Sequence, residues 1–199
     1  MRTAFRLPGT AIAVEVSVLP LVAAAFIADA SAYTALMFLA AVLHEGGHLL
    51  TLWLCGAKVR SVSVTPFGFE IAAGEGALSY RAQALCALGG IAVNLVTGVI
   101  AAGLFAVLRD PYTLFFAVSC FGFAFVNALP VRSFDGGRAV SAWAEGRYTP
   151  EKAERMTQTF SVAGIAVLTF AASGLLYVTR GNFSLAMILV YAVLAAGRA

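Results

Sequence analysis

The amino-acid sequence predicts an all-α polytopic membrane protein with about six transmembrane helices. We expect a short β-hairpin or re-entrant segment after the second helix. Of the 199 residues, 61% are apolar and 12% are charged, against about 25% charged in a typical soluble domain. The mean hydropathy is +0.89. So few charged residues could not cover the surface of a soluble domain. Disordered chains are polar and rich in charge, so disorder is excluded as well. We therefore expect a single transmembrane domain over residues 1–199.

Six apolar stretches account for the expected spans, since each crossing requires about 20 residues. They cover residues 11–28, 32–55, 82–108, 111–129, 158–179 and 183–196. The first stretch could instead be a signal peptide, because Arg2 and Arg6 precede it. Its length, its Glu15 and the immediate second stretch favour a span. Thr149 and Pro150 are suited to begin an amphipathic first turn of the fifth helix.

Two long segments connect the spans on one side of the membrane. In residues 56–80, valine and serine alternate from Val59 to Val64, and Pro66 and Gly68 follow. This pattern predicts the hairpin or re-entrant segment. The second connection, residues 131–157, is expected to be a charged loop.

The basic residues indicate the orientation of the chain. With six spans and a cytoplasmic N-terminus, 11 of the 13 Lys and Arg residues lie inside, and two, Arg109 and Arg180, lie outside. This bias predicts a multi-pass protein of the cell membrane with both termini in the cytoplasm. No basic run suggests a nucleic-acid partner. The three widely spaced cysteines are interpreted as small buried hydrophobic residues.

The second expected span contains LHEGGHLL, which places the only two histidines of the chain four residues apart. On a helix this spacing puts His44 and His48 on one face, so both imidazoles can bind one metal ion. Glu45 is turned by about 100° from His44, where its carboxylate can reach a water on that ion. Ionisable groups within a span are costly and mark functional sites, which argues against histidines that only pack helices.

A catalytic zinc needs a third protein ligand, and no further histidine exists. Asp135 is the preferred candidate, because it follows the inner end of the fourth span, on the same side as HEGGH. Gly136 and Gly137 let the backbone approach closely. Glu70 and Glu75 are the alternatives. The competing interpretation of Asp135 is an N-cap of the segment after it.

These motifs together resemble the site-2 protease family of intramembrane metalloproteases. The segment NALPVRSFDGGR carries Asn127, Pro130 and Asp135 in the family's N-x-x-P-x-x-x-x-D-G spacing. LGGIAVN resembles the family's Gly-Gly-Pro-x-x-Asn stretch, with Ile91 in place of proline. TPFGF resembles its Pro-Phe-Gly-Gly stretch, with Phe69 in place of the second glycine. The resemblance covers about residues 32–138, the expected catalytic core.

The resemblance implies peptide-bond hydrolysis inside or beside the membrane. It implies that His44, His48 and Asp135 hold Zn²⁺ and that Glu45 is the general base. A metal transporter or zinc sensor is an alternative, but it would carry polar ligands along several spans. An inactive scaffold is a second alternative, but it would have lost one of these four residues.

The resemblance further implies that Asn94 and Asn127 are substrate-binding residues, which help to position the substrate strand or the reaction centre. The alternative roles are interhelical packing for Asn94 and a helix-end hydrogen bond for Asn127. The expected partners are the lipid bilayer, a transmembrane or membrane-associated protein substrate and a regulatory membrane protein. Only Arg109 and Asp110 join the third and fourth spans. This compact form is similar to the stage IV sporulation protein FB type, which has no PDZ domain.

Overall fold

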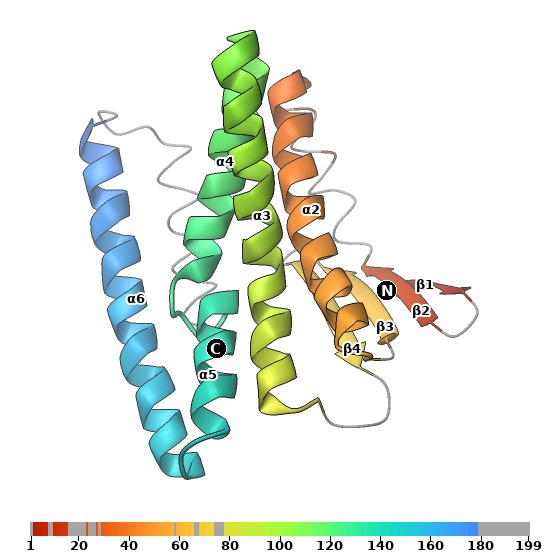
Figure 1. Ribbon diagram of the computed structural model, residues 1–199, viewed down its shortest axis with the longest axis vertical. Coiled ribbons are helices and arrows are strands. Elements are labelled where there is room, and N and C mark those ends of the chain that lie inside the picture. The colour runs from red at the N-terminus through yellow and green to blue at the C-terminus, as the bar shows by residue number, and fades with distance from the viewer. Residues whose placement is uncertain are drawn as a thin grey trace.

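Four long helices form the body of the protein in a computed structural model (Figure 1). The structure describes residues 2–7, 10–15, 23, 27, 29–57, 59–65, 68–73 and 78–178, and within the strands it describes the backbone. In this part of the chain, the helices that are long and apolar enough to cross a membrane are α2 (Ala32–Leu54), α3 (Tyr80–Leu108), α4 (Pro111–Ala128) and α6 (Pro150–Val178). They correspond to the second, third, fourth and fifth predicted spans.

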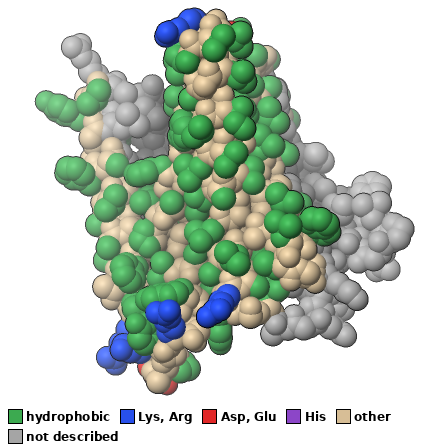
Figure 2. Space-filling model, viewed as in Figure 1, with side chains coloured by type: hydrophobic (Ala, Val, Ile, Leu, Met, Phe, Trp, Pro, Cys, Tyr) green, Lys and Arg blue, Asp and Glu red, His purple; other side chains and the backbone are tan. Residues whose placement is uncertain are grey.

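Apolar side chains cover the outer surface of these helices, as expected for a protein that faces lipid. Figure 2 shows hydrophobic side chains along the middle of the helices and Lys and Arg side chains towards their two ends. Val107 of α3 is 80% exposed, and Phe170 of α6 is 82% exposed. Soluble monomers rarely expose apolar patches of this extent. The chain is therefore a membrane protein.

The predicted first span is wrong at its N-terminal part. Residues 10–15 form strand β2 (Thr10–Glu15), which pairs antiparallel with β1 (Arg2–Leu7). A short apolar run fits a strand as well as a helix, because periodicity alone does not separate them. Glu15 thus lies in a strand. The predicted sixth span, residues 183–196, lies outside the described residues.

A four-stranded sheet, in the order β1-β2-β3-β4, corrects the all-α prediction. After α2, strands β3 (Val59–Thr65) and β4 (Gly68–Ala73) pair antiparallel, where the sequence predicts a hairpin or re-entrant segment. Strand β2 joins β3 in parallel register. The sheet is larger than predicted because the β1–β2 pair lies in a segment predicted as a helix and because the pairing of β2 with the distant β3 leaves no local sequence signal.

The connection 131–157 is not only a loop, because it contains the helix α5 (Asp135–Glu145). This helix lies beyond the C-terminal end of α4 and packs against α3 and α6 (Figure 1). Leu129, Val131 and Leu168 form a buried cluster that joins the α4–α5 turn to α6. The turn therefore has a defined position, and it sets where α5 begins.

At its C-terminal end, α3 is joined to α4 by the two-residue turn Arg109–Asp110. Arg109 adopts a left-handed conformation with φ 56°, which ends α3. Asp110 accepts a hydrogen bond from the Thr113 backbone N–H, and Pro111 occupies the first helical position. Proline suits that position because its missing N–H has no partner there in any case. This two-residue turn aligns α4 against α3 and so directs its C-terminal end towards α5.

Candidate metal centre

The two histidines of α2 face α3 and are buried. His44 is 4% exposed and His48 is 9% exposed, one turn apart on the same face. Glycines bring the two helices together. A Cβ atom on Gly47 of α2 would lie 2.5 Å from the Gly89 carbonyl oxygen of α3. A Cβ atom on Gly90 would lie 2.6 Å from His48 Nε2 and 2.8 Å from His44 Nε2. A larger side chain at Gly90 would displace the imidazoles, and one at Gly47 would collide with the backbone of α3.

Asp135 reaches the histidines as the first residue of α5. Its side chain is buried, at 5% exposure for the residue. The two glycines that follow pack against the backbone of the α4–α5 turn, where added Cβ atoms would collide with the Ala128 and Val131 carbonyl groups. The sequence argument for close approach at Gly136 and Gly137 is therefore correct in this packing. The N-cap of α5 is Phe134, whose side chain makes no cap hydrogen bond, so Asp135 is the first helical residue and not the N-cap that the competing interpretation assigns to it.

Three ligand atoms converge between α2 and α5. Asp135 Oδ2 lies 2.8 Å from His44 Nε2 and 3.1 Å from His48 Nε2, and the two Nε2 atoms are 3.2 Å apart. Four ligands about 2.0–2.1 Å from a tetrahedral zinc are about 3.3 Å from one another. The observed triangle is close to one face of that tetrahedron. This donor set therefore fits a metal ion.

The remaining nitrogens of the two imidazoles face α3. His48 Nδ1 lies 2.7 Å from the Cys86 carbonyl oxygen, which can only accept, so Nδ1 carries the proton and Nε2 is left for a metal. His44 Nδ1 lies 3.3 Å from Asn94 Nδ2. Asn94 is fully buried. Of the two predicted substrate-binding asparagines, Asn94 thus contacts a ligand of the candidate metal centre.

The Asp135 carboxyl group is ionised at neutral pH. Burial raises its pKa, but hydrogen bonds from His44 and His48 and the attraction of their charges outweigh burial and lower the pKa to about 2. The exposed Arg138 guanidinium lies 3.8 Å from the second carboxylate oxygen, Oδ1. A carboxylate must be deprotonated to bind a metal, so Asp135 is in the required form.

The other predicted site residues differ in their positions and contacts. Glu45 is half-buried and follows His44 on α2. Asn127 donates from Nδ2 to the Phe123 carbonyl oxygen of its own helix at 3.0 Å. This is the helix-end bond considered as its alternative role. Glu70 belongs to β4, where only the backbone is described, and Glu75 lies outside the described residues.

Two cysteines are closer to the site than the sequence indicates. Cys55 and Cys86 hydrogen-bond to each other through their side chains, and the Cys86 carbonyl oxygen supports His48. Sequence reasoning missed both contacts, because α2 and α3 meet only in the tertiary structure. Cys120 is buried, as predicted, but the prediction is wrong for Cys55 and Cys86, which are half-buried.

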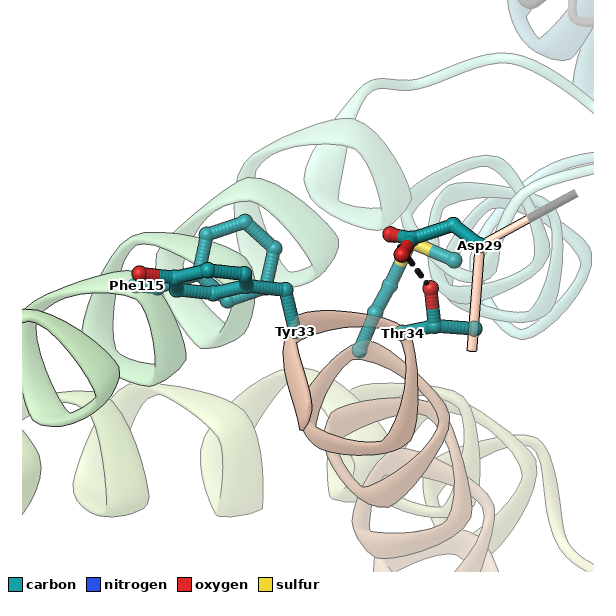
Figure 3. Close-up of a pocket in the computed structure, with 5 residues that line it drawn as sticks. Asp29, Tyr33, Thr34 and Phe115 are labelled. Atoms are coloured by element: carbon teal, nitrogen blue, oxygen red, sulfur yellow. Dashed lines mark hydrogen bonds between the residues drawn. The ribbon is translucent and has the colours of Figure 1, made fainter. Parts of the chain in front are cut away.

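A pocket of about 510 Å³ lies at the other end of α2, away from the histidines. It is lined by Asp29, Tyr33, Thr34, Met37 and Phe115. Figure 3 shows the Asp29 carboxylate bonded to Thr34 and the Tyr33 ring beside Phe115. These polar groups are already paired with one another.

The fold and the buried His-His-Asp cluster define a membrane protein with a candidate metal centre. No protein-family model matches the chain, and no curated protein matches it. Among solved structures, the chain is similar to the Site-2 Protease from Methanocaldococcus jannaschii, with 17% sequence identity and a TM-score of 0.65. The match covers 100% of this chain and 94% of that one. The chain thus has the site-2 protease fold over its whole length.

Proposed function

We propose that this protein is an intramembrane zinc metalloprotease that hydrolyses peptide bonds of membrane-embedded or membrane-associated proteins. One observation carries the proposal: the ligand atoms of His44, His48 and Asp135 meet within 2.8–3.2 Å in a chain with the site-2 protease fold. Two histidines and one carboxylate are a ligand set of catalytic zinc, which leaves a fourth position for water or substrate.

Each residue of the cluster has a defined role in this proposal. His44 and His48 would hold zinc through Nε2, and Asp135 would hold it through Oδ2. When bound, zinc supplies polarisation of the scissile carbonyl and a lowered pKa of water. Glu45 accepts the proton of the attacking water as the C–O bond forms. It then delivers that proton to the leaving amine as the C–N bond breaks.

The membrane setting supports a substrate drawn from the bilayer. The apolar surface of the helices offers lipid contact next to the cluster. A peptide bond in a helix is shielded, so a transmembrane substrate must unwind before cleavage. β4 is an edge of the sheet, and an extended peptide can pair with such an edge. We propose that both termini are cytoplasmic and that the compact, stage IV sporulation protein FB-like type applies.

The first test compares the wild type with Glu45→Gln. Both are purified in detergent, loaded with zinc and incubated with fluorescently labelled casein as an unfolded polypeptide. We expect Glu45→Gln to hydrolyse casein about 10²–10⁴-fold more slowly, because it lacks the proton acceptor, and to bind zinc as tightly as the wild type. Chelation should stop the wild-type reaction, and added zinc should restore it. Equal hydrolysis by both proteins would reject Glu45 as the base.

A further inference from the structure

Asn94 presents an unsatisfied atom beside His44. The side chain is fully buried in α3. Its Nδ2 lies 3.3 Å from His44 Nδ1, and its buried Oδ1 has no hydrogen-bond partner among the residues that the structure describes. Buried polar atoms without partners are rare in folded proteins, and each calls for an explanation.

The tautomer of His44 supplies that explanation. In the observed orientation, the Asn94 amide N–H points at His44 Nδ1, which suits an imidazole that carries its proton on Nε2. His44 Nε2, however, is the atom that faces Asp135 and His48. A neutral imidazole binds a metal through an unprotonated nitrogen. Metal binding therefore places the proton on Nδ1, opposite an amide that also donates.

A reversal of the Asn94 amide removes this conflict. The oxygen and nitrogen of an amide are nearly equal in size, and their assignment follows from the hydrogen bonds that they make. After a 180° reversal, Oδ1 faces the His44 Nδ1–H group and gains a donor. The NH₂ group moves to the present Oδ1 position, where the described residues offer no hydrogen-bond partner. One amide group thus lacks a partner in either orientation, and the reversed orientation is the one that satisfies the His44 Nδ1–H group.

His48 already has the equivalent arrangement. Its Nδ1 donates to the Cys86 carbonyl oxygen at 2.7 Å. Cys86, Gly90 and Asn94 follow one another at intervals of four residues, so they lie along one face of α3. Gly90 leaves space for both imidazoles, and the residues on either side of it supply an acceptor for each ring. One face of α3 thus orients both histidines.

We propose that Asn94 is a positioning residue that accepts a hydrogen bond from His44 Nδ1–H and so presents Nε2 to the metal. This inference rests on the proposed function, since it assumes that the cluster holds zinc. It replaces the substrate-binding role that the sequence resemblance implies for Asn94. A partner of this kind raises metal affinity by orienting the ligand and fixing its tautomer.

The test measures zinc affinity by competition with a chelating dye in the wild type, Asn94→Leu and Asn94→Asp. Leucine has a similar volume and no acceptor, so we expect an affinity lower by about 10–100-fold. Aspartate offers an oxygen in either orientation, so we expect it to stay within a few-fold of the wild type. Equal affinity of Asn94→Leu and the wild type would overturn the proposal. An equal loss in Asn94→Asp would also overturn it, since it would mean that the NH₂ group matters.

A spectroscopic readout follows the proton itself. Because the chain has only two histidines, selective ¹⁵N-histidine labelling gives two imidazole signals. In the zinc-loaded wild type and in Asn94→Asp, both rings should show a protonated Nδ1. In Asn94→Leu, one of these Nδ1–H signals should be lost to exchange, and the His48 signal should remain. If Asn94→Leu does not fold, loss of the signal in Asn94→Asp still overturns the proposal.

These experiments need no substrate, so the two proposals can fail separately. Casein hydrolysis that is insensitive to Glu45→Gln would reject the proposed base and leave the role of Asn94 intact. Unchanged zinc affinity in Asn94→Leu would reject the role of Asn94 and leave the protease intact. A wild-type protein that binds no zinc would overturn both.

Discussion

The two ends of α2 are packed differently: the helix is closely packed against α3 around the histidines, whereas a pocket lies beside it around Tyr33. Around His44 and His48, the helix lies so close to α3 that glycine is required, and the polar groups there are buried. Around Tyr33, the tyrosine ring packs against aromatic rings of α4 beside a pocket of about 510 Å³. The Asp29 carboxylate at that end is exposed and bonded to Ser31 and Thr34 nearby in the chain.

This difference separates the part of α2 that must hold ligand atoms at fixed distances from the part that contributes only to stability. Buried ligand atoms must be held at fixed distances by partners on other helices, because misplacement of a ligand weakens metal binding. Exposed groups with local hydrogen bonds have no such requirement. We therefore expect substitutions near the histidines to change metal binding and substitutions near Tyr33 to change stability alone.

The largest expected effect is that of Gly90→Ala. Its Cβ atom would lie 2.6 Å from His48 Nε2, which is closer than van der Waals contact permits. Either the imidazole or α3 must move, and overpacking of this kind costs about 1–3 kcal/mol. We expect zinc affinity, measured by chelator competition, to fall at least as far as the roughly 10–100-fold typical of lost ligand support.

Gly103→Ala is the matched control on the same helix. No atom of the described residues lies within 4 Å of a Cβ atom at that position, so zinc affinity should not change. If Gly90→Ala bound zinc as tightly as Gly103→Ala, the close packing of α3 against the imidazoles would be refuted.

A smaller effect is expected from Tyr33→Ala at the other end of α2. The Tyr33 ring lies 5.0 Å from the Tyr112 ring and 4.9 Å from the Phe115 ring, centroid to centroid. Each aromatic pair contributes about 0.5–1.5 kcal/mol beyond its buried area. The variant should unfold at a lower temperature in detergent and retain wild-type zinc affinity.

Tyr177→Ala serves as its control, because Tyr177 is 87% exposed. This control should leave the unfolding temperature unchanged. A drop in zinc affinity for Tyr33→Ala would show that the two ends of α2 are coupled, and the comparison between them would fail.

The smallest expected effect is on the pH dependence of protein stability, through Asp110, the N-cap of α4. Hydrogen bonds from the Thr113 side chain and backbone lower the pKa of the Asp110 carboxyl below its ordinary value of 3.8. A lowered pKa in the folded state means that the ionised cap stabilises the protein fully above that ordinary value. The contribution is lost as the pH falls through the lower folded-state pKa.

Unfolding temperatures of the wild type and Asp110→Ala, measured between pH 7 and pH 3, test this expectation. The wild type should be the more stable at pH 7, and the difference should narrow towards pH 3. A difference that stays constant over this range would exclude the ionised carboxylate as its source.

Much of the helical body could be predicted because each long helix is encoded locally. The start of α6 at Pro150 and the two-residue turn after Leu108 follow from proline and capping chemistry in the adjacent residues. Strands β1 and β2 are neighbours in the chain, but their short apolar runs do not distinguish a strand from a helix. The parallel pairing of β2 with β3 could not be predicted locally, because the two strands are more than 40 residues apart. α5 is not among the predicted elements, because Gly136 and Gly137 are poor helix formers, although the N-cap interpretation of Asp135 allows for a helix there.

The candidate metal centre likewise has features that the sequence predicts and features that it does not. The i, i+4 spacing predicts that His44 and His48 share a helix face, and Asp135 was selected by its side of the membrane and its neighbouring glycines. The acceptors behind the imidazoles could not be predicted. One is the Cys86 backbone carbonyl group, which every residue type carries, and the other is a buried asparagine whose partner lies 50 residues away.

The sequence alone determined that the chain is a membrane protein and that its only histidines lie one helical turn apart, because composition and helical periodicity are properties of neighbouring residues. The tertiary structure decided that Asp135 completes a cluster with them and that α3 orients both rings. Those distances depend on the close packing of α2, α3 and α5, and such packing is a property of the folded chain as a whole.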